Sequence, residues 1–353
     1  MRRFLSIIII AALLPGLAGC ALFPAKKQGV EQLLVVQAMG VDREGPRLVL
    51  SMVSAADSSR GEGPVRLSGS GPTLAQAQRD IALRSTEEEL LCAHTGHILL
   101  GEDSAGAALG EVLDAVCRSR ELRMDVPLYI LRGGSAELAL LHAGDERIGA
   151  VEQLDALSAA AVARDGEKPP SAARIAAAQA GDGCALIAAL RCAEAAEQGE
   201  DGAVLTLLPD GRAIVRGGDI LGYLEQEDML ALDLLRGARG VHTLPLTLPD
   251  GQTVTVQTAP GSTRRRLLRT EAGTPTLGME ISLSASVLEI RGGGVAEDGA
   301  LGAALEQELL RRALRLVRLQ RSLGADFLGL GDRPLHLTVS ARISHTGDLR
   351  DAP

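Results

Sequence analysis

The sequence predicts an α+β or mixed α/β protein made of consecutive small domains, each packing helices on a mixed or antiparallel sheet. Three observations lead to this prediction. Strand-like runs alternate with helix-like runs in the first half of the chain, Pro-Asp-Gly turns link strand pairs in the second half, and a long basic helix follows an alternating strand near the end. The 353 residues, 46% of them hydrophobic and 23% charged, suffice for two or three folded domains.

The N-terminal segment has the pattern of a bacterial export signal. Two arginines precede an apolar run over Leu5–Leu14, which is shorter than the roughly 20 residues that a membrane span needs. The run leads to Leu17-Ala18-Gly19-Cys20, which resembles a lipoprotein cleavage site. We therefore predict a lipoprotein signal peptide over residues 1–19, followed by a tether over residues 20–29 that begins with the lipidated Cys20.

The alternative, an ordinary signal peptide with a chance cysteine, stays open. A diacylglyceryl group on Cys20 would give stable membrane attachment, because each buried CH₂ contributes about 0.8 kcal/mol and two acyl chains suffice. The longest later apolar windows fall well short of a membrane span. We expect a folded body held by lipid at the outer face of the cell membrane.

The composition argues against nucleic acid as a partner. The formal net charge is -9, so the chain does not have the positive charge that neutralises phosphates. With no Trp, two Tyr and three Phe, it also has few rings on which bases could stack.

Residues 30–145 are predicted to form an N-terminal α/β domain. Apolar runs over Val30–Val41 and Arg47–Val53 flank a Gly-Pro turn and predict a hairpin. Four further elements follow a helix that begins after the N-cap Thr73: a strand over His97–Gly101, a helix over Ser104–Cys117, a strand over Val126–Leu131 and a short helix over Ser135–Leu141.

Residues 146–200 are Ala-rich and are predicted to be a helical connector. Pro169-Pro170 interrupts the helices, and the Ala, Leu and Glu content of residues 184–198 favours another helix. The alternative, that these helices belong to the first domain, stays open.

Residues 201–353 are predicted to form a C-terminal α+β domain, which could divide into two subdomains near residue 260. Pro209-Asp210-Gly211 and Pro249-Asp250-Gly251 each separate two strand-like runs and predict two hairpins. A helix over Gln226–Leu235, a strand over Leu277–Ile290, a helix over Ala300–Leu323 and a strand over Leu335–Ile343 complete the domain.

Two basic segments of this half have alternative interpretations. Arg264-Arg265-Arg266 is typical of an edge strand protected by charge, although it could also bind an anionic headgroup. The arginines over 311–321 indicate either a solvated helix face or a contact surface.

No catalytic, metal or cofactor site is predicted, and no ligand-binding residue is assigned. His94 and His97 have a spacing that two metal ligands on a helix could use, but the intervening Thr-Gly favours a turn that leads into a strand. The serines lack a GxSxG motif, and Gly292-Gly293-Gly294 lacks the Lys and Ser/Thr of a phosphate loop.

The four cysteines after Cys20 are Cys92, Cys117, Cys184 and Cys192. Their even number permits disulfides without requiring them. On a helix, Cys184 and Cys192 would be about 12 Å apart, which is too far for a bridge. Buried free thiols are therefore favoured, while the disulfide state stays open.

Five short sequence motifs, which follow one another along the chain, resemble those of the Ger(x)C family, the lipoprotein C subunits of nutrient germinant receptors in spore-forming bacteria. Besides the lipobox at Cys20, they are Met39-Gly40-Val41-Asp42, Gly69-Ser70-Gly71-Pro72-Thr73, His97-Ile98-Leu99-Leu100-Gly101-Glu102, Arg118-Ser119-Arg120-Glu121-Leu122-Arg123 and Ala325-Asp326-Phe327-Leu328-Gly329-Leu330-Gly331. The resemblance is weakest over residues 145–200, and the chain has Leu or Ala where the family usually has aromatics.

The resemblance implies a non-enzymatic subunit with an α/β fold on the outer face of the spore's inner membrane. It implies assembly with an integral-membrane A subunit and a transporter-like B subunit, to which the germinant is generally assigned. Cys20, as the lipidation site, is the residue whose role transfers. Two other classes remain as alternatives, a substrate-binding lipoprotein of a membrane transporter and a lipid-anchored hydrolase.

Overall fold

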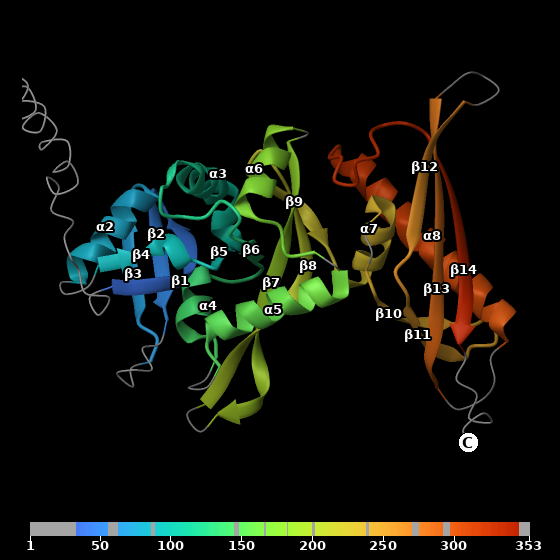
Figure 1. Cartoon of the computed structure of the whole chain (residues 1–353), viewed down its shortest axis with the longest axis horizontal. Helices are drawn as coiled ribbons and strands as arrows, with labels where there is room; N and C mark the ends of the chain where they lie inside the picture. The colour runs from blue at the N-terminus through green and yellow to red at the C-terminus, as the bar shows by residue number, and fades with distance from the viewer. Residues whose placement is uncertain are drawn as a thin grey trace, which may run out of the picture.

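The computed structural model describes residues 33–55, 63–85, 89–144, 148–165, 167–181, 183–199, 202–237, 240–269, 275–291 and 297–345. The predicted signal peptide, Cys20 and the tether lie outside these residues. Two sheets organise the described chain, and they follow one another along the sequence (Figure 1). No helix among the described residues is long and apolar enough to cross a membrane.

The first sheet is mixed and has nine strands within the described residues. The strand order is β3-β2-β1-β5-β6-β7-β8-β9, and the short β4 pairs with β1. The central strands β1, β5, β6 and β7 are parallel, whereas antiparallel strands flank them on both sides. The strands are β1 (Leu33–Glu44), β2 (Arg47–Ser54), β3 (Arg66–Gly71), β4 (Glu89–Leu91), β5 (His97–Gly101), β6 (Leu128–Leu131), β7 (Cys184–Gly199), β8 (Gly202–Arg216) and β9 (Asp219–Leu224).

Helices cover both faces of this sheet (Figure 1). One hydrophobic cluster joins the sheet to α2, α3 and α6, and another joins the opposite face to α4 and α5. Side chains of β5 alternate between the clusters, as the two-residue period of a strand requires: Ile98 and Leu100 face one, and Leu99 faces the other. The helices are α2 (Leu74–Arg84), α3 (Glu102–Arg118), α4 (Ala136–His142), α5 (Ala150–Asp165) and α6 (Ala172–Ala180).

The second sheet has five strands within the described residues and packs against the long helix α8. The central strand β13 pairs antiparallel with β11 and β12, and parallel with β14. The parallel pair follows from α8, which returns the chain to the start of the sheet before β14 begins. The elements are α7 (Met229–Arg236), β10 (Thr243–Thr247), β11 (Thr253–Thr258), β12 (Ser262–Arg269), β13 (Pro275–Ile290), α8 (Asp298–Leu323) and β14 (Leu335–His345).

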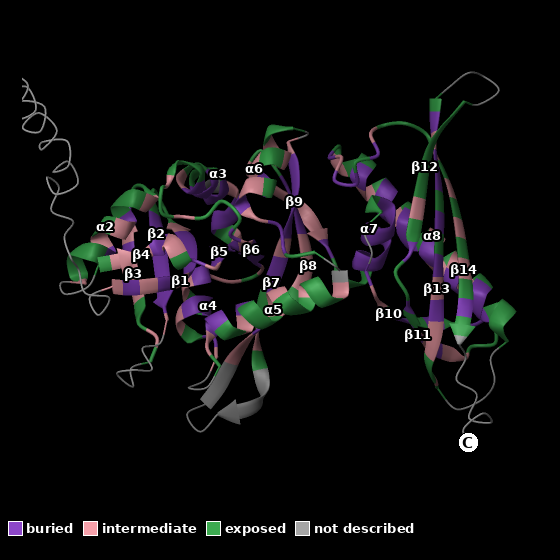
Figure 2. Cartoon of the chain, viewed as in Figure 1, coloured by how far each residue is buried: buried purple, intermediate pink, exposed green. Residues whose placement is uncertain are grey.

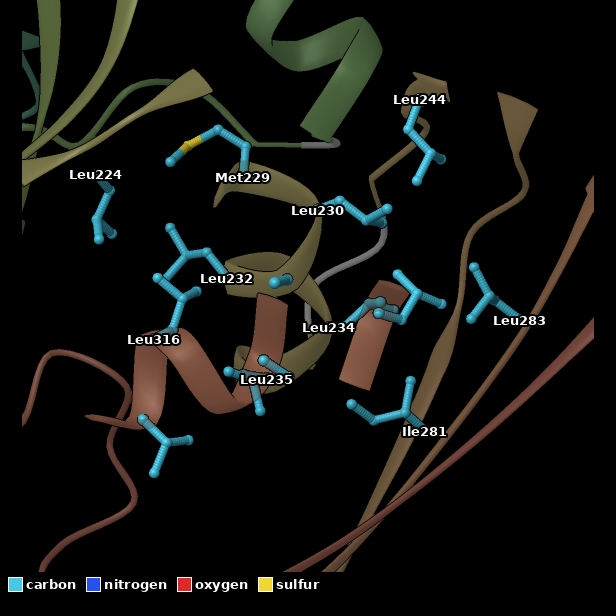
Figure 3. Close-up of a cluster of buried hydrophobic side chains, with 14 of the residues drawn as sticks. Leu224, Met229, Leu230, Leu232, Leu234, Leu235, Leu244, Ile281, Leu283 and Leu316 are labelled. Carbon is cyan, nitrogen blue, oxygen red and sulfur yellow. The ribbon is translucent and has the colours of Figure 1, made fainter. Parts of the chain in front are cut away.

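Helix α7 lies where the two sheets meet. Every residue from Met229 to Leu235 is buried, as expected for a helix that is apolar on nearly all sides (Figure 2). In Figure 3, Met229 and Leu232 lie on the side of Leu224 from the first sheet, whereas Leu230 and Leu234 lie on the side of the second. One continuous hydrophobic cluster therefore joins the two sheets through α7.

Arginines of α8 hold the start of α7. Arg312, only 8% exposed, donates to the Glu227 carbonyl at 2.6 Å, and Arg315 pairs with the Glu227 carboxylate at 3.2 Å. Hydrogen bonds from Arg311 and Arg312 to Glu308 lower the pKa of that carboxyl to about 2, with burial opposing them. Part of the basic stretch over 311–321 is thus internal, whereas Arg311, Arg318 and Arg321 are exposed.

A buried carboxylate fixes α4 to the sheet. Asp42 on β1 accepts hydrogen bonds from the Ser135 hydroxyl (2.9 Å), the Ala136 amide (3.0 Å) and the Glu137 amide (2.7 Å) at the N-terminus of α4. Gly101 leaves the space for it, because a Cβ there would lie 2.0 Å from Asp42 Oδ1.

The predicted fold class is confirmed, and most predicted elements are present. The hairpin β1–β2, helix α2 with its N-cap Thr73, and the hairpin β10–β11 lie where the sequence placed them. The Arg264-Arg265-Arg266 segment lies on β12, which pairs only with β13 among the described strands and is an edge strand, as predicted.

Two element predictions are wrong. The predicted helix over 184–198 is strand β7, because pairing with β6 on one side and β8 on the other overrides the helix propensity of its alanines.

The predicted turn at Pro209-Asp210-Gly211 is a bulge inside the continuous strand β8. Ala188 pairs with Arg212 and Leu190 pairs with Pro209, which leaves one extra residue on β8. Gly211 has φ 78°, and Asp210 pairs with Arg132 at 3.2 Å. Residues 184–224, which the prediction divided between connector and C-terminal domain, thus form three strands of the first sheet.

No disulfide joins the four described cysteines. Cys92 and Cys184 are buried and Cys192 is partly buried, in line with the expectation of buried thiols, whereas Cys117 is exposed. Cys184 and Cys192 both lie on β7, where eight residues span about 26 Å at 3.3 Å each. The two cysteines are therefore too far apart for a disulfide, as predicted, but because they are separated along a strand and not along a helix.

We expect Leu232→Ala to lower the free energy of unfolding by about 2–5 kcal/mol, because it leaves a cavity in the cluster that joins the two sheets. Urea titration followed by circular dichroism measures this change. The matched control is Leu314→Ala on α8, at a leucine that is 40% exposed, which should change stability by less than about 1 kcal/mol. Equal effects of the two variants would contradict the role given to α7.

Asp42→Ala should cost about 1.5–3 kcal/mol, because three donors at the start of α4 lose a charged acceptor. Amide hydrogen exchange of Ala136–His142 should accelerate more than exchange of β5. The control Asp103→Ala removes an exposed carboxylate from the first turn of α3 and should cost at most about 1 kcal/mol. Unchanged protection of α4 in the Asp42 variant would show that other contacts fix this helix.

Candidate functional site

The histidines considered as metal ligands are not brought together. His94 is exposed, whereas His97 on β5 is buried and its Nε2 lies 2.9 Å from Asp155 Oδ1 on α5. The His97 ring also contacts the Tyr129 ring at 5.8 Å between centroids. Within the described ranges, no three His, Cys, Asp or Glu residues are grouped so that they could hold a metal ion. His97 therefore ties the sheet to α5.

A cavity of about 350 Å³ opens beside His97. Its charged wall includes Arg123 and Asp125, which pair with each other at 2.6 Å, and Lys168 from the loop between α5 and α6. Arg123 and Asp125 thus pair with each other and the His97 ring faces Asp155, whereas Lys168 and Arg174 of this lining also line a neighbouring, larger cavity.

A larger cavity, which we call the basic cleft, lies at the boundary between the two sheets. It has a volume of about 470 Å³ and is lined by α6, the start of β7, the middle of β8, the end of α7, β12 and the loop after α8. Its charged lining residues are Lys168, Arg174, Arg212, Arg236 and Arg265 on the basic side and Glu167, Asp233 and Asp326 on the acidic side. Among the described lining residues, five cations therefore face three carboxylates.

The loop after α8 forms one rim of the basic cleft. The carboxylate of Asp326 accepts hydrogen bonds from the amides of Leu330 and Gly331, both at 2.8 Å. Gln320 Oε1 accepts from the Leu328 amide at 2.8 Å, and Gly324 ends α8 in the left-handed conformation with φ 59°. The motif Ala325–Gly331, the last one that carried the family resemblance, is thus a loop that is stabilised by its own hydrogen bonds and borders the basic cleft.

Arginine contacts hold this rim to the rest of the molecule. Arg216 on β8 of the first sheet donates to the Gly324 carbonyl at 2.5 Å. Arg236 at the end of α7 donates to the Phe327 carbonyl at 3.0 Å, and Arg265 on β12 donates to the Leu235 carbonyl at 2.6 Å. The walls of the basic cleft are therefore connected by hydrogen bonds as well as by the apolar cluster around α7.

Sequence reasoning did not find the basic cleft. Arg174, Arg212 and Arg236 come from three separate elements, and nothing in their local sequence marks them as a group. Arg265 belongs to the segment interpreted as a charge-protected edge strand, with binding of an anionic headgroup as the alternative. Cys20, the one site residue assigned from the sequence, lies outside the described residues.

Over the described residues, the fold defines a class of α+β protein in which a nine-stranded mixed sheet and a five-stranded sheet share one buried helix. Residues 26–157 match the family model described as the spore germination protein N-terminal domain. The fold is similar to that in the crystal structure of the GerBC protein, with a TM-score of 0.55 and 17% sequence identity, over 87% of this chain and 96% of that one. A comparison with curated proteins found no match.

These two findings confirm the resemblance to the Ger(x)C germination proteins that the sequence motifs indicated. The match to the spore germination protein N-terminal domain covers residues 26–157, and the similarity beyond them is one of fold. Four of the sequence motifs that carried the resemblance lie within residues 26–157. In the structure, Asp42 binds the N-terminus of α4 and Gly101 leaves room for its carboxylate, whereas Thr73 caps α2 by accepting a hydrogen bond from the Gln76 amide.

The pH dependence of stability should report on His97. Burial lowers the pKa of His97 below its ordinary 6.5, and the hydrogen bond with Asp155 opposes this only in part. The folded protein therefore binds fewer protons at His97 than the unfolded chain does. The stabilisation that comes from the neutral His97 ring is present above about pH 6.5 and is lost as the pH falls below that value. The other titratable group that faces the ring is Tyr129 on β6.

We expect His97→Gln to unfold in less urea than the wild type at pH 7.5, but to lose less stability between pH 7.5 and 5.5. The exposed His94 offers the control, since His94→Gln should retain the wild-type pH dependence. A His97 variant whose stability falls with pH as steeply as that of the wild type would refute this assignment.

Proposed function

We propose that this protein is a non-catalytic, lipid-anchored subunit of a nutrient germinant receptor, in the position of the C subunit. The observation that supports the proposal most directly is the match of residues 26–157 to the spore germination protein N-terminal domain. The shared fold with the GerBC protein over 87% of the chain extends the likeness to the C-terminal sheet.

The anchor is proposed from the sequence. Cys20 follows the apolar signal run within a lipobox, and its diacylglyceryl group would hold the protein at the outer face of the membrane. The first described strand begins at Leu33, so about 12 residues separate it from Cys20. Even fully extended, such a tether spans only about 40–45 Å, which keeps the folded body near the membrane.

The partners proposed are an integral-membrane A subunit and a transporter-like B subunit. A lipid-tethered body meets such partners in two dimensions, and tethering raises the effective concentration of each contact. The role proposed for this subunit is therefore assembly rather than chemistry, and no residue is assigned to catalysis.

A substrate-binding lipoprotein of a membrane transporter is the second candidate, and the basic cleft between two units is the feature that favours it. Such proteins usually have two similar lobes around their cleft. Here the two units differ in the part of the chain that the structure describes: one is a nine-stranded sheet with helices on both faces, and the other is a five-stranded sheet on one long helix. This asymmetry and the family match favour the receptor subunit.

Germination of spores tests the proposal. We expect spores that lack the gene, and spores with Cys20→Ala, to lose dipicolinate release in response to one class of nutrient while responding normally to non-nutrient triggers. Cys117→Ala is the matched control, because it removes an exposed thiol from the folded body and should leave germination unchanged.

Normal germination with every nutrient, in a strain from which paralogous genes have been deleted, would reject the receptor role. Loss of response in the gene deletion but not in Cys20→Ala would reject only the anchor. Detection of the Cys20→Ala protein in the spore soluble fraction would confirm that the lipid holds the wild type at the membrane.

A further inference from the structure

We propose that the basic cleft binds a small anion that carries carboxylate or phosphate groups. The inference rests on the geometry of the cleft and is independent of the germination role.

Four arginines reach this cavity from four different elements. Arg174 comes from α6 and Arg212 from β8 of the first sheet, whereas Arg236 ends α7 and Arg265 lies on β12 of the second. Gathering like charges around a cavity opposes folding unless something compensates them. A guanidinium is the side chain best suited to bind carboxylate or phosphate, because its planar fork donates two parallel hydrogen bonds.

Two of these guanidinium groups are held in place without being neutralised. Arg236 donates to the Phe327 carbonyl at 3.0 Å, and Arg265 donates to the carbonyls of Leu235 at 2.6 Å and Gly329 at 3.5 Å. A carbonyl fixes the direction of a guanidinium but carries no net charge. The remaining donors of these two arginines thus keep their positive charge at a fixed place, as a preorganised anion site requires.

The three described carboxylates of the lining offset only part of this charge, because five cations line the same cavity. Asp233 pairs with His242 at 2.8 Å, and Asp326 accepts the two amides of its own loop. Glu167 pairs with Arg174 at 3.2 Å, but both side chains are about 60% exposed, at 61% and 59%. A surface pair of this kind contributes little to stability, so a bound anion can replace the carboxylate on Arg174.

The electrostatic environment of Arg236 agrees with an excess of positive charge. Its pKa is lowered, first because its guanidinium is partly desolvated and then because Arg212 and Arg174 repel it. The attraction of Glu167 and Asp233 acts in the opposite direction without restoring the ordinary value.

The cavity is the size of a metabolite site. Its volume of about 470 Å³ lies within the range of about 300–1,000 Å³ typical of small-molecule pockets. Apolar side chains such as Ile175, Leu186 and Phe327 line it together with the arginines, so a ligand with a short carbon skeleton and several anionic groups fits it better than a bare ion.

Isothermal titration of the full-length lipoprotein in neutral detergent tests the proposal. Citrate and inorganic phosphate are the two probes, titrated separately at constant ionic strength, with potassium chloride as the reference. We expect saturable, submillimolar binding of at least one probe, and the preferred probe tells carboxylate from phosphate recognition.

Two variants locate the binding. Arg236→Gln and Arg174→Gln should each weaken it at least tenfold, and the exposed Arg174 keeps the test valid if the Arg236 variant fails to fold. The matched control is Arg318→Gln on α8, whose guanidinium donates to Leu314 in its own helix and does not line the cleft. It should bind the probe as the wild type does.

Three results would overturn the proposal. They are the absence of saturable binding with either probe, binding that Arg236→Gln and Arg174→Gln leave unchanged, and binding of an oligoglutamate peptide with no binding of citrate or phosphate. The last result would assign the cleft to an acidic segment of a partner protein. None of them bears on the germination phenotype, so the two proposals fail separately.

Discussion

The burial of α7 between two sheets is the constraint on which the rest of the architecture depends. All seven residues from Met229 to Leu235 are buried, so no side of the helix faces solvent. The helix is therefore stable only when both sheets cover it. The first sheet supplies Leu224 and the second supplies residues such as Leu244 and Ile281 to the same cluster (Figure 3). The position of α7 also sets its C-terminal end, where Gly237 stops the helix and Arg236 points to the loop after α8. The basic cleft therefore exists because the two sheets meet through this helix.

The motifs that carried the family resemblance have structural explanations. Asp42 binds the start of α4, and Gly101 leaves room for its carboxylate. Gly71 lets β3 approach α2, because a Cβ there would lie 2.6 Å from the Ala77 amide nitrogen. Asp326 closes the loop after α8 by accepting two of its amides. These residues determine how closely helices and loops approach the sheets, and the closing motif Ala325–Gly331 also borders the basic cleft.

Local signals were enough to predict much of the fold. Thr73 and Ser135 cap helices through bonds with residues three positions on, and turns such as Pro249-Asp250-Gly251 join strands that are adjacent in sequence. The errors at β7 and at the β8 bulge have the opposite origin: an alanine-rich segment became a strand because neighbouring strands paired with it, and a turn-like tripeptide became a bulge because the pairing continued beyond it. The basic cleft could not be predicted either, because it also depends on long-range contacts: Arg174, Arg212 and Arg236 become neighbours only through tertiary packing.

The continuous core limits what an anion in the basic cleft could do. A ligand shared by two lobes commonly acts by closing a hinge, but opening these two units would expose α7 and the apolar cluster around it, at a cost of about 25 cal/mol for each Å². Arg174 and Arg212 belong to the first sheet and its helices, whereas Arg236 and Arg265 belong to α7 and β12. A ligand bound by all four arginines would therefore add a further contact between two units that the apolar cluster already joins. Its free energy of binding would then appear as added stability of the assembled pair, since it binds the folded form alone. The cleft is accordingly better suited to strengthening a preformed arrangement than to driving a large movement.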